Sequence, residues 1–170
     1  MALTSYAIAV GSNVRGRHGA PADAVRAALA LLDPVAVSRV ITSAPMGPSL
    51  RRYANAAAII ESAESPDALL RRLKAIERDF GRRRGRRWGA RVIDLDIILW
   101  SGGAWRGPGL IVPHIGFRDR GFVLGPLAAI APAWRDPVSG LTVRHLLARL
   151  CRPRALAEWA RSSVGRATDF

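Results

Sequence analysis

The chain has 170 residues and a mass of 18.3 kDa, and about half of its residues are apolar, which suits one domain with one sizeable core and excludes a disordered chain. The 26 basic residues against 13 acidic ones give a formal net charge of +13, which favours anionic partners. All the basic residues except Lys74 are arginine. A coding bias toward arginine therefore explains much of the total, and the placement of the arginines is the more informative property.

Several kinds of site are absent from the sequence. Cys151 is the only cysteine, so neither an intramolecular disulfide nor a thiolate metal site can form. The three histidines are scattered and lack zinc spacing. The first ten residues show no signal-peptide pattern and every apolar run is shorter than about 18 residues, so we expect a cytoplasmic protein with no membrane association.

The first half of the chain alternates strand and helix patterns. A β-prone run at residues 5–10 precedes a helical spacing of apolar residues at 21–32, which has proline in its first turn. Residues 35–43 alternate as a strand does, and residues 53–62 form another β-prone run. The segment between them, 44–52, contains prolines and a glycine that predict a loop.

The second half begins with a clear helix pattern. Ser65, followed by proline, is a favourable N-cap, and the apolar stripe continues to Phe80 before Gly81 ends the helix. A basic loop at 82–91 leads into a β-prone run at 92–100. The last segments are a glycine-rich turn, a short strand, two helices and a tail, at residues 101–109, 110–112, 122–130, 142–150 and 151–170.

The order of these elements is β-α-β-β-α-β followed by C-terminal additions. This order predicts an α+β fold with a ferredoxin-like core, in which helices pack on an antiparallel sheet. We assign residues 1–150 to a single domain and residues 151–170 to an arginine-rich tail with no assigned role.

Two aspartates alternate within the strand predicted at 92–100. Asp94 and Asp96 project from the same face, while Leu95 between them faces the other way. Neighbouring carboxylates repel each other, and a divalent cation relieves that repulsion. Oxygen ligands with no nearby His or Cys favour Mg²⁺. The alternative is an exposed strand face with two solvated carboxylates.

The loop before this strand is unusually basic. Residues 81–91 contain six arginines and three glycines. Arginine offers a planar fork of donors that suits phosphate oxygens, and paired carboxylates beside such a loop are typical of phosphoryl transfer. A solvated basic loop that reflects coding bias is the alternative, above all for Arg83 and Arg86.

Short motifs along the chain carry a resemblance to a known family. They are GSN at 11–13, YANAA at 53–57, IE at 76–77 with GR at 81–82, RWGARVIDLDI at 87–97, VPH at 112–114 and RGFVLGPL at 120–127. In this order and spacing they resemble the 6-hydroxymethyl-7,8-dihydropterin pyrophosphokinases of folate synthesis, over roughly residues 5–148. That family has a ferredoxin-like core, as the element order predicts.

The resemblance implies that pyrophosphate moves from ATP to the hydroxymethyl group of the dihydropterin and that AMP leaves. It implies that Asp94 and Asp96 hold two Mg²⁺ ions, and that Arg82 and Arg84 belong to a catalytic loop. The positions that it assigns to ATP are Glu77, Arg87, Trp88, Arg91, Ile97, His114 and Arg120. The positions that it assigns to the pterin are Ser43, Ala44, Met46, Tyr53, Asn55 and Phe122, with the two aromatic rings sandwiching the pterin.

Some positions depart from the family pattern. The loop at 48–52 is shorter and more basic than usual, and Ala44 and Ala90 stand where proline is common. Ile115 takes a place often held by proline or tyrosine, and Ile111 takes a position that can be polar. These departures concern loop closure and adenine contacts more than the chemistry.

Two other functions remain open from the sequence. A basic ferredoxin-like domain could bind RNA, and residues 120–123 superficially resemble part of an RNA-recognition motif, although its further aromatic residues are missing. The chain could also be a pterin- or nucleotide-binding relative without activity, but the Asp94 and Asp96 pair and the loop arginines argue against that. We expect a monomer that binds small molecules and no nucleic acid.

Overall fold

The computed structural model describes residues 2–44, 51–81 and 92–152. In this part of the chain a five-stranded antiparallel sheet has the order β2-β4-β1-β5, and β3 also pairs with β4. Two further strands form a separate antiparallel pair. The strands are β1 (Thr4–Ser12), β2 (Ala36–Val37), β3 (Ile41–Ser43), β4 (Tyr53–Ser62), β5 (Asp94–Trp100), β6 (Trp105–Gly107) and β7 (Leu110–Val112).

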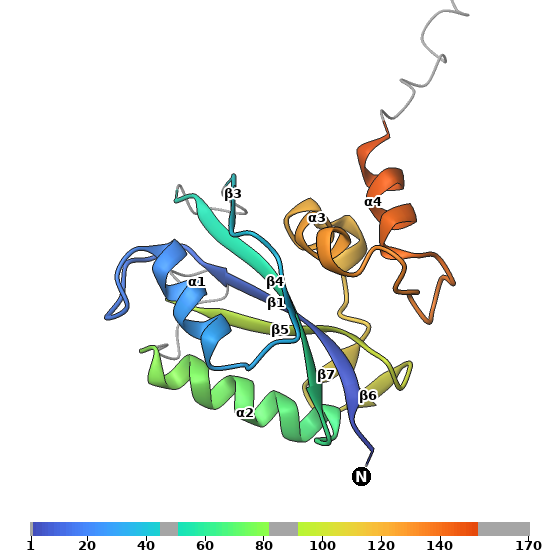
Figure 1. Cartoon of the computed structure of the whole chain (residues 1–170), viewed down its shortest axis with the longest axis horizontal. Helices are drawn as coiled ribbons and strands as arrows, with labels where there is room; N and C mark the ends of the chain where they lie inside the picture. The colour runs from blue at the N-terminus through green and yellow to red at the C-terminus, as the bar shows by residue number, and fades with distance from the viewer. Residues whose placement is uncertain (1, 45–50, 82–91, 153–170) are drawn as a thin grey trace, which may run out of the picture.

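Helices cover both faces of the sheet. The core helices α1 (Pro21–Ala30) and α2 (Pro66–Asp79) lie on one face, whereas α3 (Gly121–Ile130) and α4 (Val143–Cys151) lie on the other (Figure 1). A short 3₁₀ helix, η1 (Phe117–Asp119), precedes α3. The strand order and the two core helices confirm the ferredoxin-like α+β fold, and α3 and α4 are the C-terminal additions.

The helix ends follow the local sequence. The Ser65 side chain accepts a hydrogen bond from the Ala68 amide, and Pro66 occupies the first turn of α2. The same helix is followed by Gly81, whose φ of 90° few other residues adopt and whose amide bonds to the Arg78 carbonyl. Thr142 caps α4 in the same way as Ser65 caps α2.

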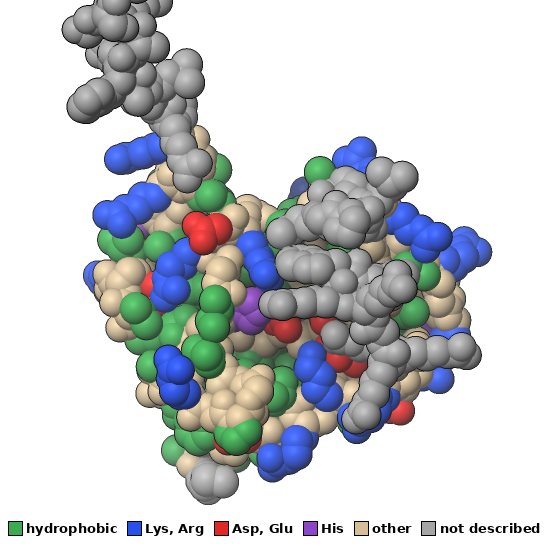
Figure 2. All heavy atoms as spheres, turned by 180° about the vertical axis from the view of Figure 1, so that it is seen from behind, with side chains coloured by type: hydrophobic (Ala, Val, Ile, Leu, Met, Phe, Trp, Pro, Cys, Tyr) green, Lys and Arg blue, Asp and Glu red, His purple; other side chains and the backbone are tan. Residues whose placement is uncertain are grey.

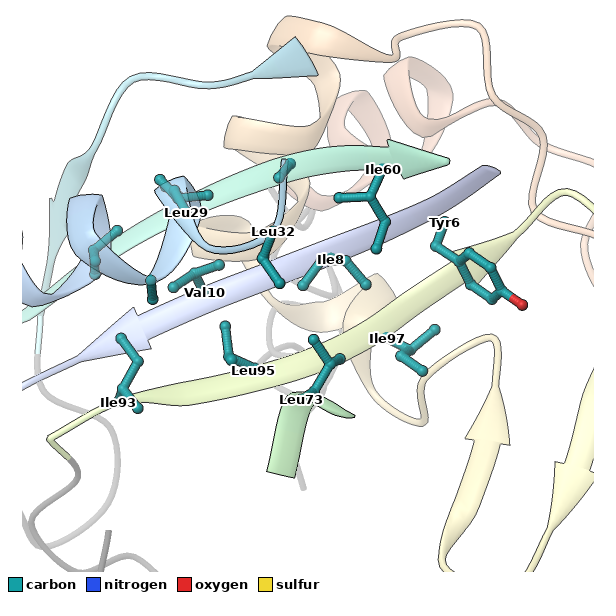
Figure 3. Packing of buried hydrophobic residues seen from close by; sticks show 14 of the residues in the cluster. Tyr6, Ile8, Val10, Leu29, Leu32, Ile60, Leu73, Ile93, Leu95 and Ile97 are labelled. Atoms are coloured by element: carbon teal, nitrogen blue, oxygen red, sulfur yellow. The ribbon is translucent and has the colours of Figure 1, made fainter. Parts of the chain in front are cut away.

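The main core lies between the sheet and the helices α1 and α2. Alternate residues of β1, namely Tyr6, Ile8 and Val10, point into it together with Leu95 and Ile97 of β5 (Figure 3). A second cluster packs α3 and α4 against the opposite face of the sheet. No helix in the described ranges is long and apolar enough to cross a membrane.

Two segments differ from the sequence prediction. The strand predicted at 35–43 is divided into β2 and β3. The Ser38 hydroxyl accepts a hydrogen bond from the Ala57 amide, which interrupts the backbone hydrogen bonding with β4. The segment predicted as a turn at 101–109 contains β6, which pairs with β7. The tail prediction for 151–170 falls almost wholly outside the described residues, and Cys151 itself ends α4.

Candidate active site

A row of paired residues crosses the sheet at one end of its central strand. Gly11 of β1 is in register with Asn55 of β4 on one side and with Asp94 of β5 on the other. Two residues earlier, Ala9 is in register with Asp96, and Ala9 packs into the cluster beneath α3. Paired residues of a sheet share a face, so Asn55, Asp94 and Asp96 all lie on the α3 side.

Small residues keep space between the amide and the carboxylates. A Cβ atom at Gly11 would lie 3.2 Å from the Asn55 side-chain oxygen. Asn55 is 5% exposed, and its side-chain nitrogen donates to the Ser43 hydroxyl over 2.8 Å. Tyr53 lies two residues before Asn55 on the same strand face and is half-buried, and Phe122 of α3 packs toward the same cluster. Ser43, Tyr53 and Asn55 thus lie together on the sheet, and Phe122 lies on α3, the helix that packs against β3 and β4. Ala44 is exposed at the end of β3.

The two carboxylates are partly accessible. Asp94 is half-buried, and the Asp96 side chain is 33% exposed. The Nε2 atom of His114 lies 3.9 Å from a carboxylate oxygen of Asp96. Figure 2 shows histidine atoms in a hollow beside acidic side chains, with Lys and Arg side chains around it.

The His114 ring has a lowered pKa, which favours its neutral form. Burial lowers its pKa below the usual value; the negative charge of Asp96 acts in the opposite direction, and the positive charge of Arg120 adds to the lowering. A neutral ring beside a carboxylate can accept a hydrogen bond or donate one from its remaining N–H.

A cavity of about 380 Å³ opens at the outer edge of β5. One wall comes from α2 and the opposite wall from β7 and the residues around it. Its lining residues are Leu70, Lys74, Asp96, Ile97, Gly107, Gly109, Leu110, Ile111, His114 and Ile115. The cavity therefore borders one of the paired carboxylates on the side away from Asn55.

Glu77, one of the positions assigned to ATP, is a buried residue and not an exposed ligand. Its side chain is 2% exposed and accepts hydrogen bonds from the Leu95 amide over 2.8 Å and from Lys74 over 2.7 Å. It therefore joins α2 to β5 at the residue between the two aspartates. Ile97 is buried but contributes to the cavity lining, as does His114.

Several predicted residues lie outside the described ranges. They are Met46, Arg82, Arg84, Arg87, Trp88 and Arg91. Sequence reasoning also missed Leu70, Lys74 and Leu110 as cavity residues. A signal for two of them existed, because Leu70 and Lys74 are four residues apart and so share a helix face.

Asp94 and Asp96 are the candidate metal ligands of the site. Among the described residues no group of three His, Cys, Asp or Glu side chains is arranged to hold a metal ion. Two carboxylates with a partly open side suit Mg²⁺, which takes one or two carboxylates and completes its coordination with phosphate oxygens and water. The residues present therefore fit a cation that binds together with a polyphosphate.

Comparison with known proteins identifies the family. Residues 7–132 match the family model described as 7,8-dihydro-6-hydroxymethylpterin-pyrophosphokinase, HPPK. The chain belongs to the HPPK family. A Synechocystis protein named 2-amino-4-hydroxy-6-hydroxymethyldihydropteridine pyrophosphokinase is 40% identical over 71% of this chain and 64% of its own length. The protein of that name from Methylorubrum extorquens is 38% identical over 87% of this chain and 94% of its own length.

Solved structures support the same fold. The Plasmodium falciparum HPPK-DHPS structure with pteroate has a TM-score of 0.66 and 12% identity, and the match covers 87% of this chain and 42% of that one. At this identity the likeness shows the fold alone. This chain spans less than half of the length of that protein, and these comparisons do not favour the RNA-binding alternative.

Proposed function

We propose that this HPPK-family chain transfers pyrophosphate from ATP to the hydroxymethyl group of 6-hydroxymethyl-7,8-dihydropterin. The observation that carries the proposal is the position of Asp94 and Asp96 between two different environments. On one side lie Asn55 and the aromatic residues, and on the other lies the cavity along β5. Two substrates can thus meet at the paired carboxylates. We further propose that the chain acts as a cytoplasmic monomer.

The reaction balances without a protein nucleophile. The pterin hydroxyl oxygen forms a bond to the β-phosphorus of ATP, the bond between that phosphorus and the oxygen shared with the α-phosphate breaks, and AMP leaves. The hydroxyl proton passes to solvent. The contribution of the protein is to hold both substrates in line and to compensate charge.

The pterin half of the site uses hydrogen bonding and stacking. Asn55 presents an amide, already oriented by Ser43, to the polar edge of the flat ring. Tyr53 and Phe122 supply the stacking faces. Backbone groups of Ala44 and Met46 would complete the binding of that edge.

The ATP half uses the cavity along β5 and the basic loop. Ile97, His114 and Arg120 would contact the nucleotide, together with the loop residues Arg87, Trp88 and Arg91. Arg82 and Arg84 would neutralise charge on the transferred group. Two Mg²⁺ ions held by Asp94 and Asp96 would supply Lewis-acid neutralisation of the phosphate oxygens.

The direct test is AMP release from ATP and the hydroxymethyl dihydropterin, with and without Mg²⁺. We expect AMP release that requires the pterin and the divalent cation. RNA retention on a filter across a salt series tests the rival function. Tight, salt-resistant RNA binding without AMP release would overturn the proposal.

A second test reports on the cavity without turnover. Lys74 is the only lysine and its side chain is 36% exposed at the cavity wall, so its modification by an amine-reactive reagent can be followed by mass spectrometry. We expect ATP to protect Lys74 and inorganic triphosphate to protect it much less. Equal labelling of Lys74 with and without ATP would show that the nucleotide does not bind in this cavity.

A further inference from the structure

The pair formed by Lys74 and Glu77 is not explained by the helix that carries both residues. Glu77 is a carboxylate with a 2% exposed side chain, and burying such a charge costs several kcal/mol before pairing. It also lies near the C-terminal end of α2, where the helix dipole disfavours negative charge. Along a helix, an ion pair in which Lys precedes Glu stabilises the helix less than one in which Glu precedes Lys. The helix alone therefore gives no reason for this buried pair.

The partners of the pair supply a reason. One oxygen of Glu77 accepts both the Lys74 ammonium and the Leu95 amide, over 2.7 and 2.8 Å. The same ammonium lies 3.4 Å from the Leu95 carbonyl oxygen, a longer contact. Both polar groups of the Leu95 backbone are thus held by α2.

The position of Leu95 makes this contact consequential. β5 is the terminal strand of the described sheet, and in an antiparallel pair alternate residues direct their backbone groups away from the neighbouring strand. Leu95 directs its amide toward α2 rather than toward β1. Its two chain neighbours are Asp94 and Asp96. A rotation of this peptide would change the separation of their carboxylates.

We propose that Lys74 and Glu77 are positioning residues that fix the Leu95 backbone and thereby hold Asp94 and Asp96 at the spacing needed for a divalent cation. This inference rests on the proposed function for the identity of the cation–phosphate ligand. Lys74 also lines the cavity next to Asp96, so the pair joins the cavity wall to the carboxylates.

The decisive variant is Lys74→Met, because two explanations predict opposite signs. Removing a cation near the carboxylates would strengthen Mn²⁺ binding if only Coulomb attraction mattered. Loss of positioning would weaken it, by about 10-fold, as is typical when a partner of a metal ligand is removed. Mn²⁺ binding is measured by electron paramagnetic resonance at a saturating concentration of the ATP analogue whose α- and β-phosphorus atoms are bridged by carbon, so that a weaker contact of Lys74 with the nucleotide does not enter the result.

Matched variants separate positioning from folding. Glu77→Gln retains an oxygen for the Leu95 amide and is expected to weaken Mn²⁺ binding less than Lys74→Met does. Lys74→Arg restores a donor and is expected to recover most of the binding. Arg71→Met removes a cation from the exposed face of the same helix and should leave Mn²⁺ binding within about two-fold of the unmodified protein.

The outcomes are distinct. Unchanged or tighter Mn²⁺ binding in Lys74→Met overturns the inference, as does a lowered melting temperature alone or an equal loss in Arg71→Met. Loss of Mn²⁺ binding in Lys74→Met and recovery in Lys74→Arg support it. If the unmodified protein binds Mn²⁺ in this way but releases no AMP, the proposed function fails while the positioning role stands.

Discussion

Asp136 and the pair Asp94 and Asp96 are carboxylates in two regions that differ in how the protein surrounds them. Asp136 is fully buried and accepts two hydrogen bonds from the Arg118 guanidinium, at 2.7 and 2.8 Å, and others from Ser139 and the Val138 amide. The Asp96 side chain is one-third exposed, and the His114 ring lies 3.9 Å away. Asp136 is surrounded by donors of the protein, whereas Asp96 borders an open cavity. The first arrangement serves stability, and the second suits a ligand.

The largest expected effect is at the ligand-facing pair. Asp96→Ala or Asp94→Ala should lower the rate of AMP release by more than about 1,000-fold, because cation binding loses half of its protein ligands. Removal of one of two repelling carboxylates should leave the melting temperature unchanged or slightly raised. Rate assays and thermal unfolding check both effects. Wild-type activity in either variant would refute the metal assignment.

The opposite result is expected at Asp136. Arg118→Met leaves a fully buried carboxylate without its guanidinium partner, and breaking a buried pair typically costs about 3–5 kcal/mol. Denaturant unfolding measures the free energy of unfolding, and kcat for the folded fraction should stay within about two-fold. A large loss of kcat without a loss of stability would contradict the distinction between the two regions.

We also expect Asp136 to account for part of the loss of folding stability at acidic pH. Burial alone would raise its pKa, but the hydrogen bonds from Arg118, Ser139 and Val138 outweigh burial and lower the pKa below the usual value. This carboxylate therefore adds stability above the unfolded-state pKa of about 3.9, and that stability is lost as pH falls through the lower folded-state value. Unfolding measured from about pH 5 downward should show a shallower decline in Arg118→Met. Parallel curves for the two proteins would contradict this assignment.

A test of the space on the pterin side comes from Gly11→Ala. The new Cβ would lie 3.2 Å from the Asn55 oxygen, in the row that ends at Asp94. We expect the KM for the pterin to rise by about 10-fold, or about 1.4 kcal/mol, with kcat changed less. The matched control is Gly125→Ala, because a Cβ atom added there would meet no neighbouring group within 4 Å. An equal effect of both substitutions would show that the space beside Asn55 is not the cause.

Local patterns predicted much of this organisation. The alternation around Asp94 and Asp96 placed both on one strand face, and Ser65 and Gly81 marked the ends of α2. Contacts between distant segments were not predictable in this way. The strand β6 forms because Trp105 pairs with Val112, and no local periodicity reports that pairing.

The same limit explains the polar contacts that were missed. Arg118 and Asp136 are 18 residues apart, with a helix between them, so their pairing exists only in the fold. Lys74 shares the face of α2 with Glu77, but its contact with Leu95 depends on how that helix meets the edge of the sheet. Strand alternation thus predicted which carboxylates share a face, and only packing showed that Asp136 is surrounded by donors while Asp96 borders a cavity.

The smallest effect provides the most sensitive comparison. The Ser139 hydroxyl donates to Asp136, so Ser139→Ala should cost about 1 kcal/mol, since the Ser139 amide and the guanidinium of Arg118 remain as donors. Ser101→Ala removes a hydroxyl that accepts the exposed Ser5 amide and should change stability by less than about 0.5 kcal/mol. Denaturant titration resolves this difference. A larger loss of stability for Ser101→Ala would mean that burial does not determine how much these hydroxyl hydrogen bonds stabilise the fold. The contrast between Asp136 and Asp96 would then need another cause.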